Sequence, residues 1–167
     1  MSMADMRIGS GFDVHPLVEG RPLVLGGVHV PYSKGLQGQS DGDALCHAVM
    51  DALLGAANLG NKGSLFPSSD MRYKDATSLT FLVRVAELLS VAGWRIVNVD
   101  ATILAEKPPL AGHFPAMAQN IAQALSIEVA RVSVKATTTD RLGFVGRGEG
   151  IAAQAVALLE RGELESR

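Results

Sequence analysis

Two kinds of hydrophobic spacing alternate along the chain, and they constrain its fold more than any other feature. Strand patterns occur at 7–15, 94–104, 132–136 and 151–159, and helical spacing of apolar residues occurs at 41–58, 78–92 and 113–125. Two short apolar runs about Gly26 and Gly27 predict a β-hairpin at 23–30. Glycines punctuate residues 137–149, which we expect to form a loop. This order predicts a single-domain α+β fold, in which a mixed β-sheet has helices packed on one face and a small hairpin beside it.

The same spacing predicts which side chains share a side of each element. In the first strand, Ile8, Phe12 and Val14 lie on one side, and the other side carries Arg7, Gly9, Gly11, Asp13 and His15. The first helix has a capping-box-like start at Ser40 and Asp43, and its core stripe consists of Leu45, Val49, Ala52, Leu53 and Ala56. The second helix ends near Gly93, and the residues that we expect it to turn inward are Leu79, Leu82, Val83, Ala86 and Leu89.

The composition limits the size of the fold and the kind of partner. With 167 residues we expect one domain over 1–167, with frayed ends at 1–5 and 161–167. Lys and Arg number 15 against 17 Asp and Glu, so no global charge attracts nucleic acid or an anionic membrane. No apolar run approaches the roughly 20 residues of a membrane span. A hydrophobic fraction of 47% against 19% charged residues indicates that some apolar surface is left for partners.

The single cysteine, Cys46, excludes an intramolecular disulfide and a zinc site made of cysteines alone, which suits the reducing cytoplasm. A metal ion must therefore be held by histidines and carboxylates. Asp13 and His15 are two residues apart in the first predicted strand, so their side chains project to the same face. A hydrogen-bonded pair within a strand is the ordinary alternative for such a spacing, and it stays open at this point.

A polar row lies on the first predicted helix. Asp43, His47 and Asp51 follow one another at i, i+4 and i+8, opposite the core stripe. A solvated surface is the ordinary explanation for such a row. Met50 and Leu54 share this face, however, which indicates that another part of the protein covers it.

Asp13, His15 and His47 together offer three ligands and leave a fourth position vacant, which is how catalytic zinc sites are built. The carboxylates that could orient the two imidazoles are Asp41, Asp43 and Asp51.

Hydroxyls and basic side chains gather at 135–149. The threonines at 137–139 offer hydroxyl donors, Lys135 and Arg147 offer charged donors, and the glycines let a ligand approach the backbone. Asp140 could hold a hard cation such as Mg²⁺. A phosphate cradle is one interpretation, and a glycine-rich turn at a strand end is the other. The chain has neither a P-loop nor a Rossmann fingerprint.

The chain resembles the 2-C-methyl-D-erythritol 2,4-cyclodiphosphate synthases in five segments: RIGSGFDVHPL, LGGVHVPYSKGL, SDGDALCHAVMDALLGAANLG, NVDATILAEKP and VKATTTDRLGFVGRGEGIA. The resemblance implies conversion of 4-diphosphocytidyl-2-C-methyl-D-erythritol 2-phosphate to 2-C-methyl-D-erythritol 2,4-cyclodiphosphate, with release of CMP, in the non-mevalonate isoprenoid pathway. It also implies a homotrimer with active sites between adjacent subunits, and Zn²⁺ with a second divalent cation, Mg²⁺ or Mn²⁺, in each site. It leaves open whether an isoprenoid diphosphate binds in a central cavity of the trimer.

The resemblance further implies roles for individual residues. The zinc ligands are Asp13, His15 and His47, and Asp140 helps to hold the second cation. Thr138 and Gln39 stand at positions that stabilise the transition state. The implied substrate-binding positions are Asp13, Val14, His15, Gln39, Ser40, Asn61, Lys62, Gly63, Phe66, Pro67, Ser68, Ser69, Asp70, Ala105, Glu106, Lys107, Pro108, Pro109, Leu110, Ala111, Thr137, Thr138, Thr139, Asp140, Phe144 and Arg147.

Three segments depart from the family pattern. Gln39 stands where a histidine usually precedes Ser-Asp, and we expect its amide to hydrogen-bond a phosphate without a pH-dependent charge. Asn61-Lys62-Gly63 replaces Asp-Ile-Gly, which removes an acceptor for a substrate hydroxyl and adds a positive charge. The segment 66–70 replaces Phe-Pro-Asp-Thr-Asp and keeps only the last carboxylate, Asp70.

Two other functions fit the same residues. A zinc-dependent phosphoesterase would use Asp13, His15 and His47 with a metal-bound water, and would release phosphate or open-chain products. A non-catalytic trimeric binder of isoprenoid diphosphates would fit the apolar excess and Gln39, and would show no turnover.

Overall fold

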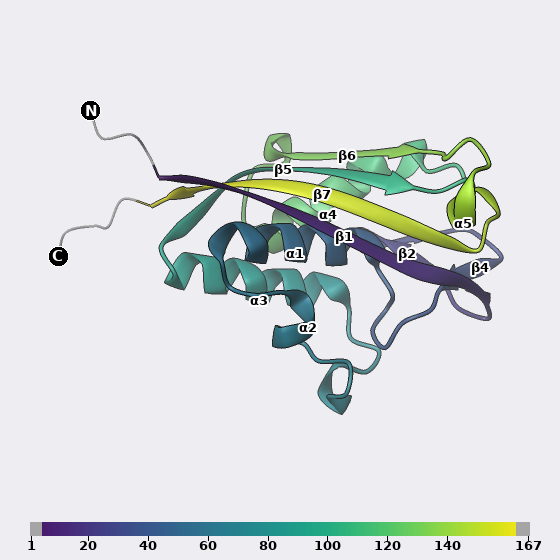
Figure 1. The fold of residues 1–167 in the computed structure, drawn as a ribbon, viewed down its shortest axis with the longest axis horizontal. Coiled ribbons are helices and arrows are strands. Elements are labelled where there is room, and N and C mark those ends of the chain that lie inside the picture. The colour runs from purple at the N-terminus through teal and green to yellow at the C-terminus, as the bar shows by residue number, and fades with distance from the viewer. Residues whose placement is uncertain (1–4, 163–167) are drawn as a thin grey trace.

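The computed structural model describes residues 5–162, and within them a five-stranded mixed sheet forms the framework (Figure 1). Its strands are β1 (Met6–Glu19), β4 (Lys34–Leu36), β5 (Trp94–Leu104), β6 (Val132–Thr137) and β7 (Gly150–Arg161). They lie in the order β4-β1-β7-β5-β6, where β5 and β6 are parallel and the other neighbouring pairs are antiparallel. The predicted α+β fold with a mixed sheet is therefore confirmed.

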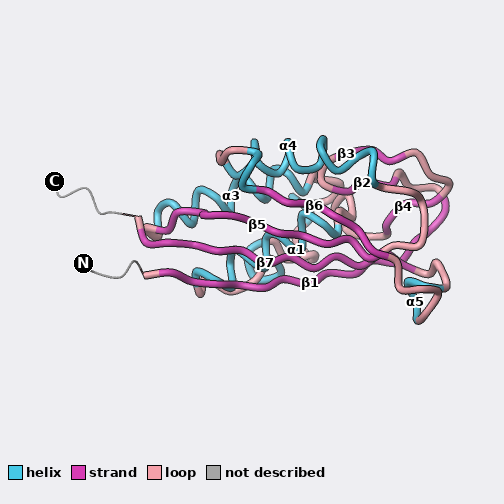
Figure 2. Tube along the Cα trace, turned by 90° about the horizontal axis from the view of Figure 1, so that it is seen from above, coloured by secondary structure: helices cyan, strands magenta, loops and turns pink. Residues whose placement is uncertain are grey.

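The helices cover one face of this sheet. The helices that do so are α1 (Ala44–Ala57), α3 (Ser78–Val91) and α4 (Phe114–Leu125). Two one-turn helices lie elsewhere, α2 (Lys62–Leu65) against α1 and α5 (Gly143–Gly146) against β7. Short 3₁₀ turns occur at Met71–Tyr73, Ala111–His113 and Val129–Arg131. Helix α1 packs on β1 and β7, α4 packs on β6, and α3 packs against both helices. The predicted hairpin is formed by β2 (Leu23–Leu25) and β3 (Val28–Val30). Figure 2 shows α5 at the end of the sheet opposite the chain ends. Across residues 5–162, the helices fall short of the length and apolarity that a membrane span requires.

Two glycines let α1 lie directly on β1. A Cβ atom at Gly9 would stand 2.0 Å from the carbonyl oxygen of Ala52, and one at Gly11 would stand 2.0 Å from that of Ala48. Such distances are far inside van der Waals contact, so any larger residue would push the helix away. Because Gly9 and Gly11 share a side of the strand with Asp13, α1 covers the side that carries the expected metal ligands.

The apolar side of β1 faces outward instead. Ile8 is 75% exposed, Phe12 is 56% exposed and Val14 is 43% exposed. On β7, Val156 is paired with Ser10 and lies on the same outer face. The apolar surface that the composition indicated is therefore the outer face of the sheet at β1 and β7.

Helix α1 begins later than predicted and is more deeply buried. Gly42 has a φ of 73°, which a right-handed helix excludes, and the carboxylate of Asp43 caps the helix by accepting the amide of Cys46 at 3.0 Å. The expected capping role of Ser40 is therefore wrong. Almost every side chain of α1 is buried, not only the predicted stripe, because the sheet covers one side and α3 another.

The buried face of α3 also differs from the prediction. Leu82 and Leu89 are buried as expected, but Val83 is exposed, and Phe81 and Val85 are buried in its place. Apolar residues occur around most of this helix, so their spacing alone did not fix its rotation. Contacts with both α1 and α4 decide which of them face the core.

The remaining differences lie at the ends of elements. The expected loop at 137–149 contains the single turn of α5. Arg161, which we expected to be frayed, ends β7 and donates its amide to the carbonyl oxygen of Asp5 at 2.9 Å. Asp5 and Gly162 of the predicted frayed ends are also described, and the amide of Gly162 donates to the carbonyl oxygen of Gly93 at 3.0 Å. Residues 1–4 and 163–167 lie outside the described part of the chain.

Candidate active site

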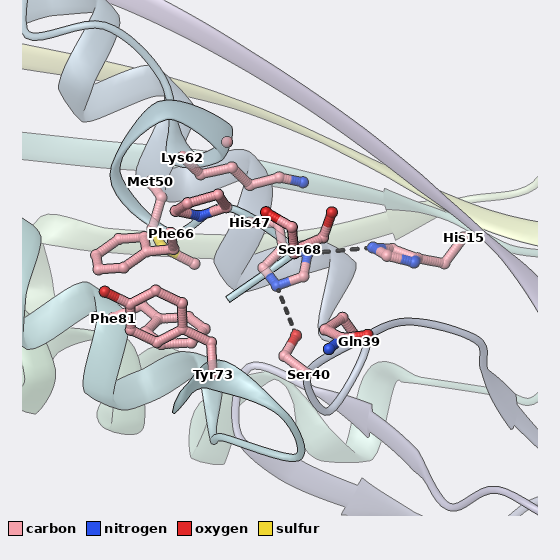
Figure 3. A pocket seen from close by; sticks show the side chains of 13 residues that line it. His15, Gln39, Ser40, His47, Met50, Lys62, Phe66, Ser68, Tyr73 and Phe81 are labelled. Atoms are coloured by element: carbon pink, nitrogen blue, oxygen red, sulfur yellow. Dashed lines mark hydrogen bonds between the residues drawn. The ribbon is translucent and has the colours of Figure 1, made fainter. Parts of the chain in front are cut away.

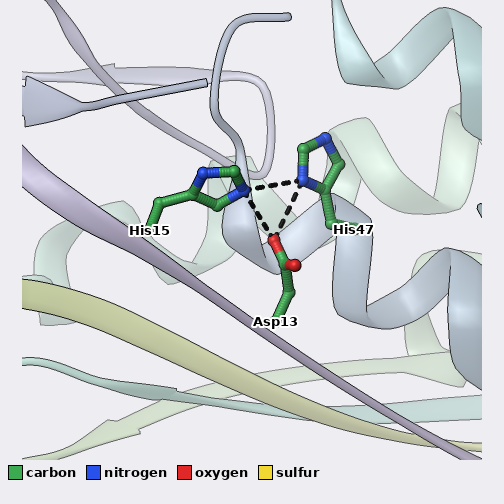
Figure 4. A group of neighbouring side chains, drawn as sticks. All are labelled: Asp13, His15 and His47. Atoms are coloured by element: carbon green, nitrogen blue, oxygen red, sulfur yellow. Dashed lines mark hydrogen bonds and ion pairs between the residues drawn. The ribbon is translucent and has the colours of Figure 1, made fainter. Parts of the chain in front are cut away.

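Three side chains converge between β1 and α1. Asp13 and His15 extend from the covered side of β1, and His47 comes from the first turn of α1 (Figure 4). The Oδ2 atom of Asp13 lies 2.8 Å from Nε2 of His15 and 3.0 Å from Nδ1 of His47. The two histidine nitrogens are 3.1 Å apart. Each residue thus directs one potential ligand atom at the same point, and these atoms all lie within 4.8 Å of one another.

Hydrogen bonds at the far side of each ring fix the tautomers. Nδ1 of His15 lies 2.5 Å from the carbonyl oxygen of Gln37, and a carbonyl can only accept, so the proton resides on Nδ1. Nε2 of His47 lies 2.9 Å from Oγ of Ser78, whose own proton is donated to Asp41 at 2.5 Å. The proton of His47 therefore resides on Nε2. A metal ion bound at the inward nitrogens, Nε2 of His15 and Nδ1 of His47, would leave both of these outer hydrogen bonds intact.

The donor set fits a divalent metal ion. Two neutral imidazoles and one carboxylate are ligands that zinc accepts, and three of them leave a coordination position for a substrate. Burial raises the pKa of the Asp13 carboxyl, but hydrogen bonds from His15, His47 and Lys62 outweigh burial and hold that pKa far below its usual range. Asp13 is therefore ionised, as a metal ligand must be.

A cavity of about 380 Å³ opens beside His15 and His47 (Figure 3). One wall is aromatic: the rings of Phe66 and Phe81 stack with centroids 4.5 Å apart, and Tyr73 meets Phe81 edge-on at 5.4 Å. The other side carries polar groups, and the described residues that line the cavity are His15, Gln39, Ser40, His47, Met50, Lys62, Gly63, Phe66, Pro67, Ser68, Ser69, Tyr73 and Phe81. The cavity therefore combines an aromatic wall with hydrogen-bond donors that lie next to the three converging ligand atoms.

A second cavity, also of about 380 Å³, lies beside α5 at the end of the sheet. The loop before α5 is held by Glu106, whose Oε1 accepts the amides of Thr139 at 3.0 Å and of Arg141 at 3.1 Å. These bonds, from Arg141 first and then from Thr139, lower the pKa of Glu106. Asp140 sits between the two donors with a φ of 53°, so the carboxylate of Glu106 fixes a tight left-handed turn.

Comparison with known proteins identifies the fold family. The model of the YgbB family matches residues 6–160, which is nearly the whole described chain. The chain belongs to the YgbB family. It is 58% identical over 156 residues to the 2-C-methyl-D-erythritol 2,4-cyclodiphosphate synthase of Syntrophomonas wolfei, covering 93% of this chain and 99% of that one. The synthase of the same name from Geotalea daltonii is also 58% identical, with 93% and 91% covered.

Solved structures of YgbB-like folds agree. The bifunctional IspDF of Campylobacter jejuni superimposes with a TM-score of 0.92 at 42% identity, covering 95% of this chain and 43% of that chain. The CDP complex of IspF from Plasmodium falciparum superimposes with a TM-score of 0.83 at 31% identity, covering 97% of this chain and 100% of that one.

In this YgbB-family chain, most of the expected substrate residues up to position 70 line the first cavity, but three point elsewhere. Val14 lies on the outer face of the sheet. Asn61 caps α2 by accepting the amide of Ser64 at 2.9 Å. Asp70 is paired with Arg72 at 2.6 Å.

Three of the later expected residues of the YgbB-family chain lie at the second cavity, and the others are in the segments next to them. Glu106, Lys107 and Arg147 line it directly. The segment 105–111 follows β5, and Thr137 ends β6. The loop from there to α5 carries Thr138, Thr139 and Asp140, and Phe144 lies in α5. Among the described residues, Asp140 does not join Asp13, His15 and His47 in their cluster. No described residue lines both cavities.

Ser78 is the main functional residue that the sequence did not indicate. Of the three carboxylates expected to orient the imidazoles, Asp41 acts through Ser78, whereas the other two have different partners. Asp43 accepts the amides of Gly26 at 2.9 Å and Gly27 at 2.7 Å, and so joins the hairpin to α1. Burial raises the pKa of Asp43 despite these donors.

Asp51 accepts the backbone amide of Lys62 at 2.6 Å and does not contact a histidine. Tyr73 and Phe81 of the aromatic wall were also not indicated by the sequence, because the three rings come from different elements: Phe66 follows α2, Tyr73 ends a 3₁₀ turn and Phe81 lies in α3.

Proposed function

We propose that this protein is a 2-C-methyl-D-erythritol 2,4-cyclodiphosphate synthase of the non-mevalonate isoprenoid pathway. It would convert 4-diphosphocytidyl-2-C-methyl-D-erythritol 2-phosphate to the cyclic diphosphate and CMP. The observation that carries this proposal is the convergence of Asp13 Oδ2, His15 Nε2 and His47 Nδ1 beside a cavity of about 380 Å³. The 58% identity to synthases of that name supports it.

In the reaction, an oxygen of the 2-phosphate attacks the β-phosphorus of the CDP unit, a new P–O–P bond forms, and the bond from the β-phosphorus to the bridging oxygen breaks. CMP leaves with that oxygen. Both reacting phosphates belong to one flexible molecule. Holding them in line can lower the activation free energy by on the order of 7–11 kcal/mol. No protein nucleophile is required.

We assign the metal centre to Asp13, His15 and His47, with Zn²⁺ as the ion. A divalent cation bound there would supply positive charge beside the phosphate that is attacked. Lys62 adds a second positive charge at the cavity wall, and Gln39 and Ser40 offer neutral donors nearby. Each of these groups opposes the repulsion between the two phosphates.

The second cavity is proposed to hold the cytidine diphosphate part of the substrate. The segment 105–111 would contact the nucleoside, and Arg147 would contact a phosphate. Thr138 would donate to the transition state, and Asp140 would hold Mg²⁺ or Mn²⁺. The Glu106 bonds to the loop keep these side chains at fixed positions.

We propose that the complete site forms between adjacent subunits of a homotrimer. The two cavities of one subunit share no described lining residue, which supports a site completed by the second cavity of a neighbour. The exposed outer face of β1 and β7 supplies apolar surface for that assembly. Sedimentation should give a trimer, and Phe12→Asp should dissociate it. A monomeric wild-type protein that turns over substrate would contradict this arrangement.

The cytoplasm is the proposed location, because the buried Cys46 is a free thiol and needs no oxidising compartment.

The decisive experiment measures CMP release from the CDP-linked 2-phosphate before and after chelation. His47→Ala should abolish the activity, whereas His29→Ala, an exposed histidine of β3, should retain it. Phosphorus NMR of the product separates the cyclic diphosphate from the inorganic phosphate that a phosphoesterase would release. Activity that resists both chelation and His47→Ala would overturn the metal assignment.

Gln39→His tests the departure at that position. We expect the variant to gain a pH-dependent component of activity near the pKa of histidine, about 6.5. An unchanged rate with an unchanged pH profile would show that Gln39 does not contact the reacting phosphates.

A further inference from the structure

Lys62 makes a contact that the proposed function does not require. Its ammonium lies 2.6 Å from Oδ1 of Asp13, and both side chains are largely shielded from solvent, at 25% and 13% exposed. Lys62 also lines the cavity beside His15 and His47 (Figure 3). A lysine that served only the substrate would leave its ammonium free toward the cavity, whereas this ammonium is bound to an expected metal ligand.

The backbone of Lys62 is fixed independently of its side chain. Its amide donates to Oδ1 of Asp51 on α1 at 2.6 Å. The preceding residue, Asn61, caps α2 through a reciprocal pair of bonds with Ser64. The start of α2 is thereby attached to α1, and the ammonium is held at Asp13 from a defined point.

The two oxygens of Asp13 are consequently divided between different partners. Oδ1 accepts from Lys62, whereas Oδ2 faces Nε2 of His15 and Nδ1 of His47. A carboxylate with one oxygen held in this way offers a metal ion the other oxygen alone. With one nitrogen from each histidine, the site then provides three single-atom ligands.

The geometry points to Lys62 as a positioning residue that makes Asp13 a one-oxygen ligand. The site thereby favours a small four-coordinate ion over a larger ion that takes more ligands. This inference rests on the proposed metal centre. Zinc accepts three protein ligands and one open position, whereas larger oxygen-preferring ions gain from a second carboxylate oxygen and more ligands. Without Lys62, Asp13 would be free to turn and bind through both oxygens.

Cobalt(II) provides a readout that does not depend on activity, because its visible bands are intense in four-coordinate sites and weak at higher coordination. The substrate-free protein is loaded with Co²⁺, and zinc and manganese affinities are measured by competition. Lys62→Met should weaken the bands and lower the zinc-over-manganese preference by roughly tenfold or more, as is typical when a partner of a metal ligand is lost. Lys62→Arg should keep most of the band intensity and most of the zinc-over-manganese preference.

Lys74→Met is the matched control, since it removes the same charge from an exposed position on the neighbouring loop. It should leave the spectrum and the metal preference unchanged. If Lys62→Met leaves both unchanged too, or if Lys74→Met alters them as strongly, the inference is overturned.

The outcomes are separable from those of the proposed function. Failure to release CMP, together with the expected cobalt spectra, would overturn the synthase assignment and support the role of Lys62. CMP release by the wild-type protein, together with an unaltered cobalt spectrum in Lys62→Met, would support the synthase assignment and overturn the role of Lys62. A wild-type protein that binds no cobalt would overturn both the metal centre and this inference.

Discussion

Replacing Ser78 with alanine should weaken metal binding without touching a ligand. Oγ of Ser78 is fully buried, accepts from Nε2 of His47 at 2.9 Å and donates to Oδ1 of Asp41 at 2.5 Å. In Ser78→Ala the ring of His47 keeps only Ser40 Oγ near that nitrogen, at 3.4 Å. The imidazole then loses the bond that fixes its tautomer and its orientation.

The size of both effects follows from these contacts. A hydrogen bond to a charged group is worth about 1.5–3 kcal/mol, so the metal-free variant should lose about 2 kcal/mol of unfolding free energy. Losing the partner of a metal-ligating histidine costs about 10–100-fold in affinity. The amide of Ser78 still donates to Oδ2 of Asp41 at 2.8 Å, so the start of α3 should survive.

Zinc affinity is measured by competition with a chromophoric chelator, and stability by urea unfolding of the metal-free protein. Ser90→Ala serves as control, because Ser90 is an exposed serine of the same helix. A zinc affinity within twofold of wild type, with the stability loss as expected, would refute the reasoning and leave Ser78 a purely structural residue.

Three further predictions, one of them with a control substitution, test other parts of the structure. Gly11→Ala places a Cβ atom 2.0 Å from the carbonyl oxygen of Ala48, and should cost about 3 kcal/mol of unfolding free energy in urea. Gly112→Ala, where a Cβ meets nothing within 4 Å, should cost far less. Glu106→Gln should speed amide hydrogen exchange at Thr139 at neutral pH. Because the pKa of Glu106 is lowered in the folded protein, its contribution is present above about pH 4.3 and fades as the pH falls through the lowered value. The exchange difference from wild type should shrink accordingly. Asp43→Ala should destabilise the protein while leaving CMP release from the remaining folded protein intact, because its carboxylate binds only backbone amides.

A specific result would contradict each of these three predictions. Equal costs for the two glycine variants would mean that α1 does not press on β1. An exchange difference that persists unchanged in acid would exclude the ionised Glu106 carboxylate as the cause. A loss of metal affinity in folded Asp43→Ala would give that carboxylate a role in orienting His47, contrary to its observed partners.

The local pattern determined the long strands and helices and which of their side chains share a face, but not the short β4, α2 and α5. The alternation in β1 placed Asp13 and His15 together, and the helical spacing of α1 separated His47 from the predicted stripe. These relations depend only on the geometry of a strand or helix, so a single sequence carries them. The boundaries of β5, Trp94–Leu104, agree with the prediction for the same reason.

Contacts between residues far apart in the chain decided which face of β1 is covered and which side chains hold the expected ligands. The apolar side of β1 was the natural candidate for the core, yet the glycine side is covered, because only a surface without side chains lets α1 approach its backbone. The partnership of Asp41, Ser78 and His47 joins the segment before α1 to α3 and α1, and no period links their positions. Likewise, Lys62 meets Asp13 across 49 residues, because α2 is attached to α1. The sequence alone thus determined the three expected ligands, whereas the tertiary structure decided what holds them, since packing and not local periodicity brings those partners together.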